Sequence, residues 1–492
     1  MDDKDLLIAI IGRHASTSGW ASLLYEDGLT FQTYTSVEQI KCTPDITIFL
    51  NDSGITPNDW KLSPAIFDQQ CPPNSKIYTL AWAENIFCEN GKNFFAPFRG
   101  WAIQWDGQSL GKFTLAREGE SPYYPIACFD GQNTFIVGDL SDSLISRGYS
   151  FRPICIGSIE EVHQLHPPVQ KEKAQRFLRD VFSTALTRAG LPAIRLSPYP
   201  PNHSIPFIFR VDIDYLIDPI MAPIRQWASD LGWKITAFVN ISGEEKWEDD
   251  IELQQGFCQP IENLNWLSEF QREGHEVACH GFFHSIWPDF ETTLTDLKKA
   301  KAILENLVNG NVIGYATPGG SWHPLIGIAA ISAGFVYTTE ASLAHGGNPF
   351  YPLVGQISKY PIQIPCSPLY PACYELGENV EVKFLNLFRA LVQEAVIYRE
   401  PISFMGHPFD LESASPTLWR GIAEIIDSLH CQPVTMAELS QILIQREKVN
   451  LRIYKSNNNW FASADLNWEI LVNGHPILVG PNVKPICLSI RN

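Results

Sequence analysis

Residues 207–214 read FIFRVDID, an apolar stretch that ends in two aspartates. This pattern predicts a β-strand, in which residues two apart point to the same face of the sheet. Asp212 and Asp214 are therefore expected on one face, at the carboxyl end of the strand. Two carboxylates this close together are stabilised as anions by a cation, which a bound metal would supply.

Strand-like and helix-like segments alternate from residue 207 to about residue 440. A regular βα alternation over this length predicts a parallel (β/α) barrel or a doubly wound sheet. The clearest predicted strands are WKITAFVNI (233–241), EVACH (276–280), VIGYATP (312–318), FVYTTE (335–340) and PISFMGH (401–407). The clearest predicted helices are NLNWLSEFQREG (263–274), TDLKKAKAILENLV (295–308), RGIAEIIDSLH (420–430) and one within residues 381–400.

The barrel-like region is flanked by two segments of different character. DLLIAIIG (5–12) and DITIFL (45–50) read as buried strands of a separate amino-terminal α/β domain. Two prolines before a charged helical start in LHPPVQKEK (165–173) indicate a boundary, and short alternating strands follow residue 446. The expected domains are 1–165 (α/β), 170–445 ((β/α) barrel) and 446–492 (a small β-rich segment).

Composition narrows the classes of function. The chain has 492 residues, with 54 acidic against 36 basic side chains and a net charge of -18, which argues against binding nucleic acid or anionic membranes. Because no apolar run of membrane-spanning length occurs and the first residues are acidic, we expect neither a signal peptide nor an anchor, and a cytoplasmic location. The 11 cysteines include no C-x-x-C pair, which favours reduced thiols.

Residues 275–284 read HEVACHGFFH, with three histidines in ten residues. Zinc proteases carry H-E-x-x-H on a helix, with histidines at i and i+4. His275 and His280 are five apart and break that pattern, whereas His280 and His284 have the spacing that suits a shared ligand. EVACH alternates like a strand, so we expect a strand that ends near His280 and a loop or first helical turn that carries His284. Such a pair alone is more often structural than metal-binding.

Five metal-ligand or acid–base residues fall at the ends of predicted strands: Asp212, Asp214, His280, His284 and His407. Working residues of (β/α) barrels lie at these carboxyl ends. One aspartate with two histidines gives three protein ligands and leaves open positions, which is typical of catalytic metal sites. The second aspartate is then available as a general base, and His407 as an acid that protonates a leaving amine. Taken singly, the same residues also fit strand-end caps and core histidines.

The order of these stretches resembles that of the polysaccharide deacetylases, metal-dependent carbohydrate esterases with a distorted (β/α) barrel. The resemblance covers roughly residues 200–440. It is carried by FRVDID (209–214), ITAFV (235–239), GHEVACHGFFHS (274–285), GYATPGGSW (314–322), GHP (406–408) and PVTMAEL (433–439).

The resemblance implies a role for each candidate residue. Asp212 would be the catalytic base and His407 the catalytic acid. The metal ligands would be Asp214, His280 and His284, and the metal a divalent ion, expected to be zinc. The implied reaction is hydrolysis of an amide C–N bond, most simply the deacetylation of an N-acetylated amino sugar or polysaccharide.

Three positions need comment. His275 lies at the start of its predicted strand, far from the barrel mouth, and is expected to be structural. The groove motif of the family carries an arginine that orients the catalytic aspartate, but residues 315–319, YATPG, contain none. Arg210 is a candidate substitute if its strand is regular. The Ser or Thr that commonly follows the first metal histidine is Gly281 here.

Other functions fit the same residues. A relative acting on an N-formyl group or another non-sugar amide would use the same chemistry. A barrel without catalysis could bind a glycan or a partner, with the amino-terminal domain as a recognition module. Two histidines and a carboxylate also suit non-haem iron chemistry. A serine nucleophile is not indicated, since no G-x-S-x-G occurs. The expected partner is an N-acylated sugar or other small amide. The sequence does not predict the oligomeric state.

Overall fold

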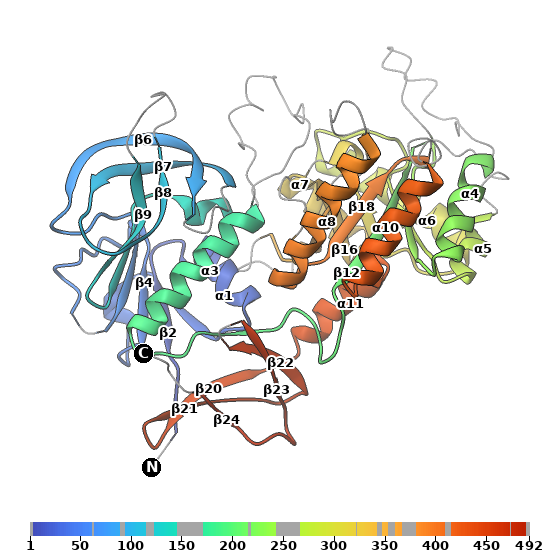
Figure 1. The fold of residues 1–492 in the computed structure, drawn as a ribbon. Helices are drawn as coiled ribbons and strands as arrows, with labels where there is room; N and C mark the ends of the chain where they lie inside the picture. The colour runs from blue at the N-terminus through green and yellow to red at the C-terminus, as the bar shows by residue number, and fades with distance from the viewer. Residues whose placement is uncertain are drawn as a thin grey trace.

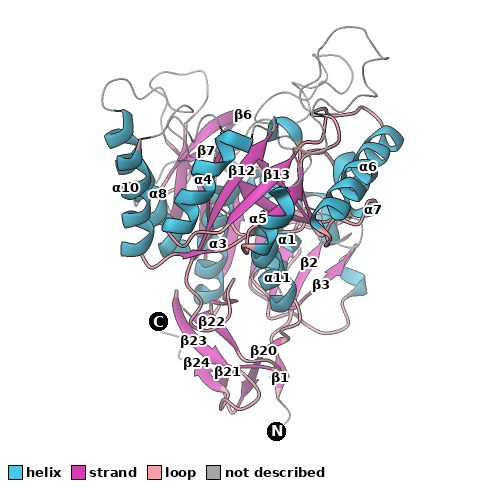
Figure 2. Ribbon diagram, turned by 90° about the vertical axis from the view of Figure 1, so that its right-hand side faces the viewer, coloured by secondary structure: helices cyan, strands magenta, loops and turns pink. Residues whose placement is uncertain are grey.

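The computed structural model has three parts, seen in Figures 1 and 2: an amino-terminal sheet, a helix-wrapped barrel and a small group of carboxyl-terminal strands. It describes residues 3–61, 63–88, 94–114, 123–144, 171–214, 218–242, 266–320, 322–341, 347–352, 360–366, 380–408, 415–472 and 474–488. The boundary expected at residues 165–170 lies outside the described residues. Among the described helices, none combines the length and the apolar character needed to span a membrane.

The predicted barrel is confirmed. Its strands follow the order β17-β16-β15-β14-β13-β12-β18, with β19 also paired to β12, and every described pair is parallel. The edge strands β17 and β18 come together, since Cys366 Sγ lies 2.9 Å from Ser403 Oγ. The strands are β12 (Pro206–Ile213), β13 (Ile235–Val239), β14 (Glu276–Cys279), β15 (Gly314–Ala316), β16 (Tyr337–Ala341), β17 (Ile362–Cys366), β18 (Ile402–Gly406) and β19 (Gln432–Pro433).

Helices surround the barrel, as the βα alternation predicted (Figure 2). They pack on strands whose side chains are almost entirely buried, which is typical of a parallel sheet covered by helices. The helices are α4 (Asp218–Asp230), α5 (Trp266–Arg272), α6 (Phe290–Val308), α7 (Pro324–Ser332), α8 (Val380–Tyr398), α10 (Pro416–Ser428) and α11 (Met436–Arg446).

The amino-terminal sheet is mixed. Its nine strands follow the order β3-β2-β4-β5-β10-β9-β8-β6-β7, parallel from β3 to β10 and antiparallel beyond. The predicted strands at 5–12 and 45–50 are confirmed as β2 and β4. The elements are β2 (Ile8–Ile11), α1 (Gly19–Glu26), β3 (Phe31–Tyr34), β4 (Ile46–Phe49), β5 (Ala65–Asp68), β6 (Lys76–Phe87), β7 (Phe94–Gln104), β8 (Ser109–Phe113), β9 (Tyr124–Asp130) and β10 (Asn133–Ile136).

The carboxyl-terminal segment forms β-strands, but each of its two sheets takes one strand from elsewhere. Strand β1 (Lys4–Asp5) pairs with β20, and β11 (Ile194–Leu196) pairs with β22. The other strands are β20 (Leu451–Ser456), β21 (Asn459–Ala464), β22 (Trp468–Val472), β23 (His475–Val479) and β24 (Ile486–Leu488).

The buried apolar side chains of the described residues form two hydrophobic cores. One fills the barrel and reaches its helices. The other joins the amino-terminal sheet, the carboxyl-terminal strands and α3 (Lys171–Arg188), which contributes Phe177 and Phe182 among others. Helix α3 thus packs with the amino-terminal core although it follows residue 170 in the chain. The domain boundaries expected at 165–170 and 445–446 stay predictions.

Glu276 is buried at the amino end of β14 and anchors the start of α11. Its carboxylate lies 2.7 Å from the Tyr337 hydroxyl and 3.1 Å from Thr236 Oγ1, and it accepts a hydrogen bond from the backbone N–H of Ala437 at 2.9 Å. Burial raises the pKa of Glu276 to about 7, although these hydrogen bonds work in the opposite direction. Glu276, which stands where the zinc-protease pattern has its catalytic glutamate, is therefore a structural group at the end of the barrel away from Asp214.

This burial gives a pH-dependent contribution to stability. Because the pKa of Glu276 rises from 4.5 to about 7, the folded protein binds this proton more tightly than the unfolded chain. The contribution is fully present below about pH 4.5 and is lost as the pH rises to about 7. Glu276→Gln cannot titrate. We expect the free energy of unfolding of wild type to fall by about 3 kcal/mol relative to E276Q between acid and neutral pH.

Urea unfolding at a series of pH values measures this difference. Glu269→Gln, a change of the same kind at an exposed position of α5, should follow the wild-type pH dependence. A constant difference between E276Q and wild type across the range would show that Glu276 does not carry this proton.

Candidate metal centre and active site

Three of the predicted residues meet at one point. One ligand atom each from Asp214, His280 and His284 lies within 4.8 Å of the other two. Asp214 Oδ1 is 3.2 Å from His280 Nε2 and 3.3 Å from His284 Nε2. Asp214 directly follows β12 and His280 directly follows β14, so the carboxyl ends of parallel strands bring them together. Two imidazoles and one carboxylate around a point are a donor set that suits a divalent metal.

The hydrogen bonds of His280 fix which ring nitrogen faces Asp214. His280 is buried, and its Nδ1 lies 2.8 Å from the backbone carbonyl oxygen of Ala316. A carbonyl oxygen only accepts, so Nδ1 carries the hydrogen and a neutral ring presents the Nε2 lone pair to the centre. Asp214 Oδ1 is buried and finds no hydrogen-bond donor in the described part of the chain. A metal ion would satisfy both atoms.

The charges of the site are strongly coupled. Burial opposes ionisation of Asp214, but the three surrounding histidines hold its pKa well below the usual range. Burial likewise opposes a charge on His280, and the neighbouring Asp214 and Asp212 carboxylates raise its pKa. The site therefore favours a net positive partner for Asp214, as a metal centre requires.

The turn between His280 and His284, the two candidate metal ligands, is held from two sides. Asp296 of α6 accepts hydrogen bonds from the backbone N–H groups of Phe282 at 2.9 Å and Phe283 at 3.1 Å. Asn240, which follows β13 and is fully buried, points its Nδ2 at the carbonyl oxygens of residues 280–282, each 3.4 Å away. These contacts fix the backbone that carries His280 and His284. Sequence patterns gave no signal for either residue, because their partners are backbone atoms.

Gly281 is required by the same turn. Its φ of +90° lies in the region that favours glycine, and a Cβ there would lie 2.6 Å from the carbonyl oxygen of Phe283. A Ser or Thr at this position would clash with the backbone. The difference from the family motif therefore has a conformational cause.

Arg210 is the partner of Asp212. Its Nε and Nη2 donate to the two carboxylate oxygens of Asp212, each at 2.7 Å, and its Nη1 donates to Thr339 Oγ1 at 3.0 Å. Both side chains are buried. Although burial would raise it, the pKa of Asp212 lies below its usual range because the charged guanidinium of Arg210 lies beside it. Arg210 thus makes the contact with Asp212 that a substitute for the groove arginine needs, and its role as that substitute stays a prediction.

The two remaining histidines lie in different places. His407 follows β18, and its Nε2 is 3.3 Å from Asp214 Oδ2, the oxygen that does not face the other histidines. Its side chain is a quarter exposed, so it is reachable from solvent. His275 accepts a hydrogen bond from the backbone N–H of Ile235 and stacks on Phe270 at the amino end of β14. The prediction that His275 is structural is confirmed.

The fold and the site define a class: a parallel (β/α) barrel with a candidate Asp–His–His metal centre at the carboxyl ends of its strands. No protein-family model matches the chain, and no curated protein matches it. Its central half is similar in fold to solved polysaccharide deacetylases and an allantoinase.

Three of these solved structures illustrate the similarity. One is assigned as a polysaccharide deacetylase from Mycobacterium smegmatis, with 17% identity, 51% of this chain and 96% of that chain covered, and a TM-score of 0.36. Another is Puue allantoinase, with 12% identity, coverage of 50% and 92%, and a TM-score of 0.38. A third is a family 4 acetyl xylan esterase from Clostridium thermocellum in complex with a cobalt ion, with 12% identity, coverage of 48% and 90%, and a TM-score of 0.32.

The support of the histidine turn by Asp296 can be tested through metal affinity. In Asp296→Asn an amide NH₂ replaces one carboxylate oxygen and faces a backbone N–H, so the turn loses one of its hydrogen bonds. We expect the dissociation constant for Zn²⁺ to rise about 10- to 100-fold, measured by competition with a chelating dye.

Glu291→Gln, at an exposed position in the first turn of the same helix, serves as control and should bind Zn²⁺ like wild type. Wild-type affinity in D296N would contradict the role given to Asp296.

Proposed function

We propose that the chain is a metal-dependent hydrolase of amide C–N bonds that removes the acyl group from an N-acylated amino sugar. One observation carries the proposal: His280, with its Nδ1 committed to the Ala316 carbonyl, turns Nε2 to the same Asp214 oxygen that His284 faces. Asp214, His280 and His284 would hold the metal, with zinc the expected ion. A divalent metal supplies Lewis acidity at the carbonyl to be attacked.

Asp212 is proposed as the general base. Its low pKa keeps it ionised at neutral pH, and each carboxylate oxygen retains a lone pair beyond the one that Arg210 uses. The bidentate contact fixes the plane of the carboxylate, which a single-point contact would not do. Asp212 would take the proton of the attacking water.

His407 is proposed as the general acid. His407 faces Oδ2 of Asp214, whereas His280 and His284 face Oδ1. A substrate amide bound near Asp214 would therefore lie close to both Asp212 and His407. The partly exposed side chain of His407 would donate a proton to the departing nitrogen, which leaves as a free amine.

The same groups would also hydrolyse an N-formyl group or another small amide. The experiment below therefore measures which acyl group is released, and from which sugar. A barrel that only binds a glycan is less well supported. Its main argument is the arginine that the groove motif lacks, and Arg210 makes the corresponding contact with Asp212.

Metal content and acyl release separate the roles of the two aspartates. Purified protein is expected to hold about one divalent metal per chain and to release acetate or formate from N-acyl amino sugars. Asp214→Asn and His280→Gln should lose the metal, whereas Asp212→Asn should keep it and lose hydrolysis by about 1,000-fold or more.

His475→Gln, an exposed histidine on β23, is the matched control and should retain metal and activity. Full metal content in both D214N and H280Q would refute the ligand assignment. Metal without release from any N-acyl compound would refute the proposed reaction.

The orientation of Asp212 by Arg210 predicts a loss of activity without loss of metal. Arg210→Lys keeps the positive charge but cannot hold both oxygens of Asp212. We expect kcat to fall about 100-fold, because a small misplacement of a catalytic group has effects of this size. Arg225→Lys, a surface ion pair with Glu273, should leave kcat unchanged. An R210K enzyme with wild-type kcat would show that the bidentate contact is not needed.

A further inference from the structure

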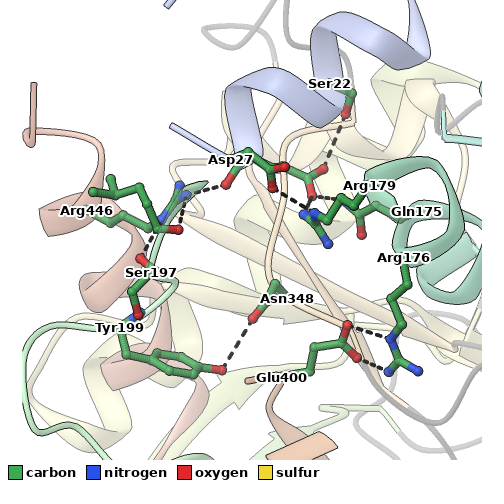
Figure 3. Close-up of polar contacts among 12 residues, drawn as sticks. Ser22, Asp27, Gln175, Arg176, Arg179, Ser197, Tyr199, Asn348, Glu400 and Arg446 are labelled. Atoms are coloured by element: carbon green, nitrogen blue, oxygen red, sulfur yellow. Dashed lines mark hydrogen bonds and ion pairs between the residues drawn. The ribbon is translucent and has the colours of Figure 1, made fainter. Parts of the chain in front are cut away.

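A pocket lies at the other end of the barrel, between α11, β11 and the end of α1, and Figure 3 shows polar contacts around it. It is lined by residues at the end of α1, by β11 and the segment after it, by residues 348–351 and by α11. Helix α11 begins beside the amino ends of β13 and β14, away from Asp214, since the Met436 N–H donates to Thr236 Oγ1. The pocket is therefore separate from the candidate metal centre.

Three arginines line this pocket, and only one has an acidic partner of its own. Arg179 donates through Nε to Asp27 Oδ1 at 2.7 Å, with Glu26 Oε2 3.5 Å from its Nη2. Arg446 donates to backbone carbonyl oxygens, that of Ser197 at 3.1 Å and those of Leu196 and Glu26 (Figure 3). Its acceptors are uncharged, so its positive charge is not neutralised by an ion pair.

The side chain of Arg195 makes neither a hydrogen bond nor an ion pair with the described part of the chain, although its backbone belongs to the pairing of β11 with β22. It lies on β11 and is partly buried in the pocket wall. Burial first, and then the charge of Arg179, lower the pKa of Arg195 to about 10. Burial also lowers the pKa of Arg446, although the neighbouring charges of Asp27 and Glu26 act in the opposite direction. Buried cations without counter-charges are costly, which makes both guanidinium groups ready partners for an anion.

The nearby carboxyl groups do not supply that anion. Asp27 accepts from Arg179. Glu26 Oε2 lies 3.5 Å from Arg179 Nη2 and accepts a hydrogen bond from the Gln175 side chain. The Glu447 carboxylate faces away, accepting from the hydroxyls of Tyr25 at 3.2 Å and Tyr351 at 3.1 Å. The charge of Glu400 also acts on Arg195, but both of its carboxylate oxygens accept hydrogen bonds from Arg176. Arg195 and Arg446 therefore line the pocket without an ion pair to the described part of the chain.

We propose that this pocket binds a small oxyanion, a phosphate or carboxylate group, between Arg195 and Arg446. The planar guanidinium fork suits such groups, because its N–H donors match two oxygens at once. Arg195 and Arg446 both line this pocket, so one small group bound there can contact both side chains. The bound oxyanion would link β11 to α11 and so connect the amino-terminal core to the barrel.

Calorimetric and thermal titrations of the full chain with sodium phosphate, sodium acetate and sodium chloride at constant ionic strength test the proposal. We expect phosphate or acetate, but not chloride, to bind and to raise the unfolding midpoint by about 2 °C at ten times the dissociation constant. The stronger of the two identifies the oxyanion as a phosphate or a carboxylate. A midpoint that responds equally to all three salts overturns the proposal.

Arg195→Gln is the informative variant, because Arg195 holds no other described group in place. It should weaken oxyanion binding about 10- to 100-fold. Without oxyanion it should be at least as stable as wild type, since a buried cation has been removed. Arg272→Gln, an exposed arginine of α5, removes the same charge and should bind like wild type.

Asp214→Asn should also bind the oxyanion like wild type, which separates this pocket from the candidate metal centre. Unchanged binding in R195Q would overturn the proposal. So would a loss of stability of R195Q in oxyanion-free buffer, because Arg195 would then be a structural residue.

Discussion

The bidentate ion pair between Arg210 and Asp212 is the interaction on which the candidate active site depends. Both residues lie on β12, and regular strand geometry places them, together with Asp214, on one face. The arginine neutralises one of two adjacent carboxylates, so both can stay ionised in a buried place. With Asp212 committed to Arg210, Asp214 is left to face the histidines. One strand thereby sets the proposed base and a candidate metal ligand side by side.

The other strands of the barrel place the candidate histidines next to the end of β12. Parallel pairing brings the ends of β14 and β18 to the same edge, and the turn after β14 is fixed by Asn240 and Asp296. At the opposite end, Glu276 accepts a hydrogen bond from the first turn of α11 and so links β14 to this helix. Arg446, at the last turn of α11, lines the pocket that also contains Arg195. Helix α11 thus connects the barrel to the second hydrophobic core, as do the ion pairs of Arg176 on α3 with Glu394 and Glu400. The two ends of the barrel carry different chemistry, a candidate metal centre and a basic pocket.

The site residues could be predicted because they stand in short stretches whose order along the chain is specific. Asp214 lies far in sequence from the His280–His284 pair, yet Asp214 and His280 each stand at the end of a predicted strand, and parallel strands place such positions together. Asp296 and Asn240 could not be predicted in this way, since they act on backbone atoms and have no spacing signature. The pairing of β1 and β11 with the carboxyl-terminal strands was also missed, because it joins segments at opposite ends of the chain.

The sequence by itself determined the barrel, the alternation along β12 and the identity of the ligand-type residues, since these follow from local periodicity and from side-chain chemistry. Only the tertiary structure decided that Arg210 turns to Asp212, that Gly281 is demanded by a left-handed turn, and that α3 packs with the amino-terminal core. Only it brought Arg195 and Arg446 to one pocket. The physical reason is that burial and pairing of charges depend on which segments meet, and contacts between distant segments leave no mark in local sequence.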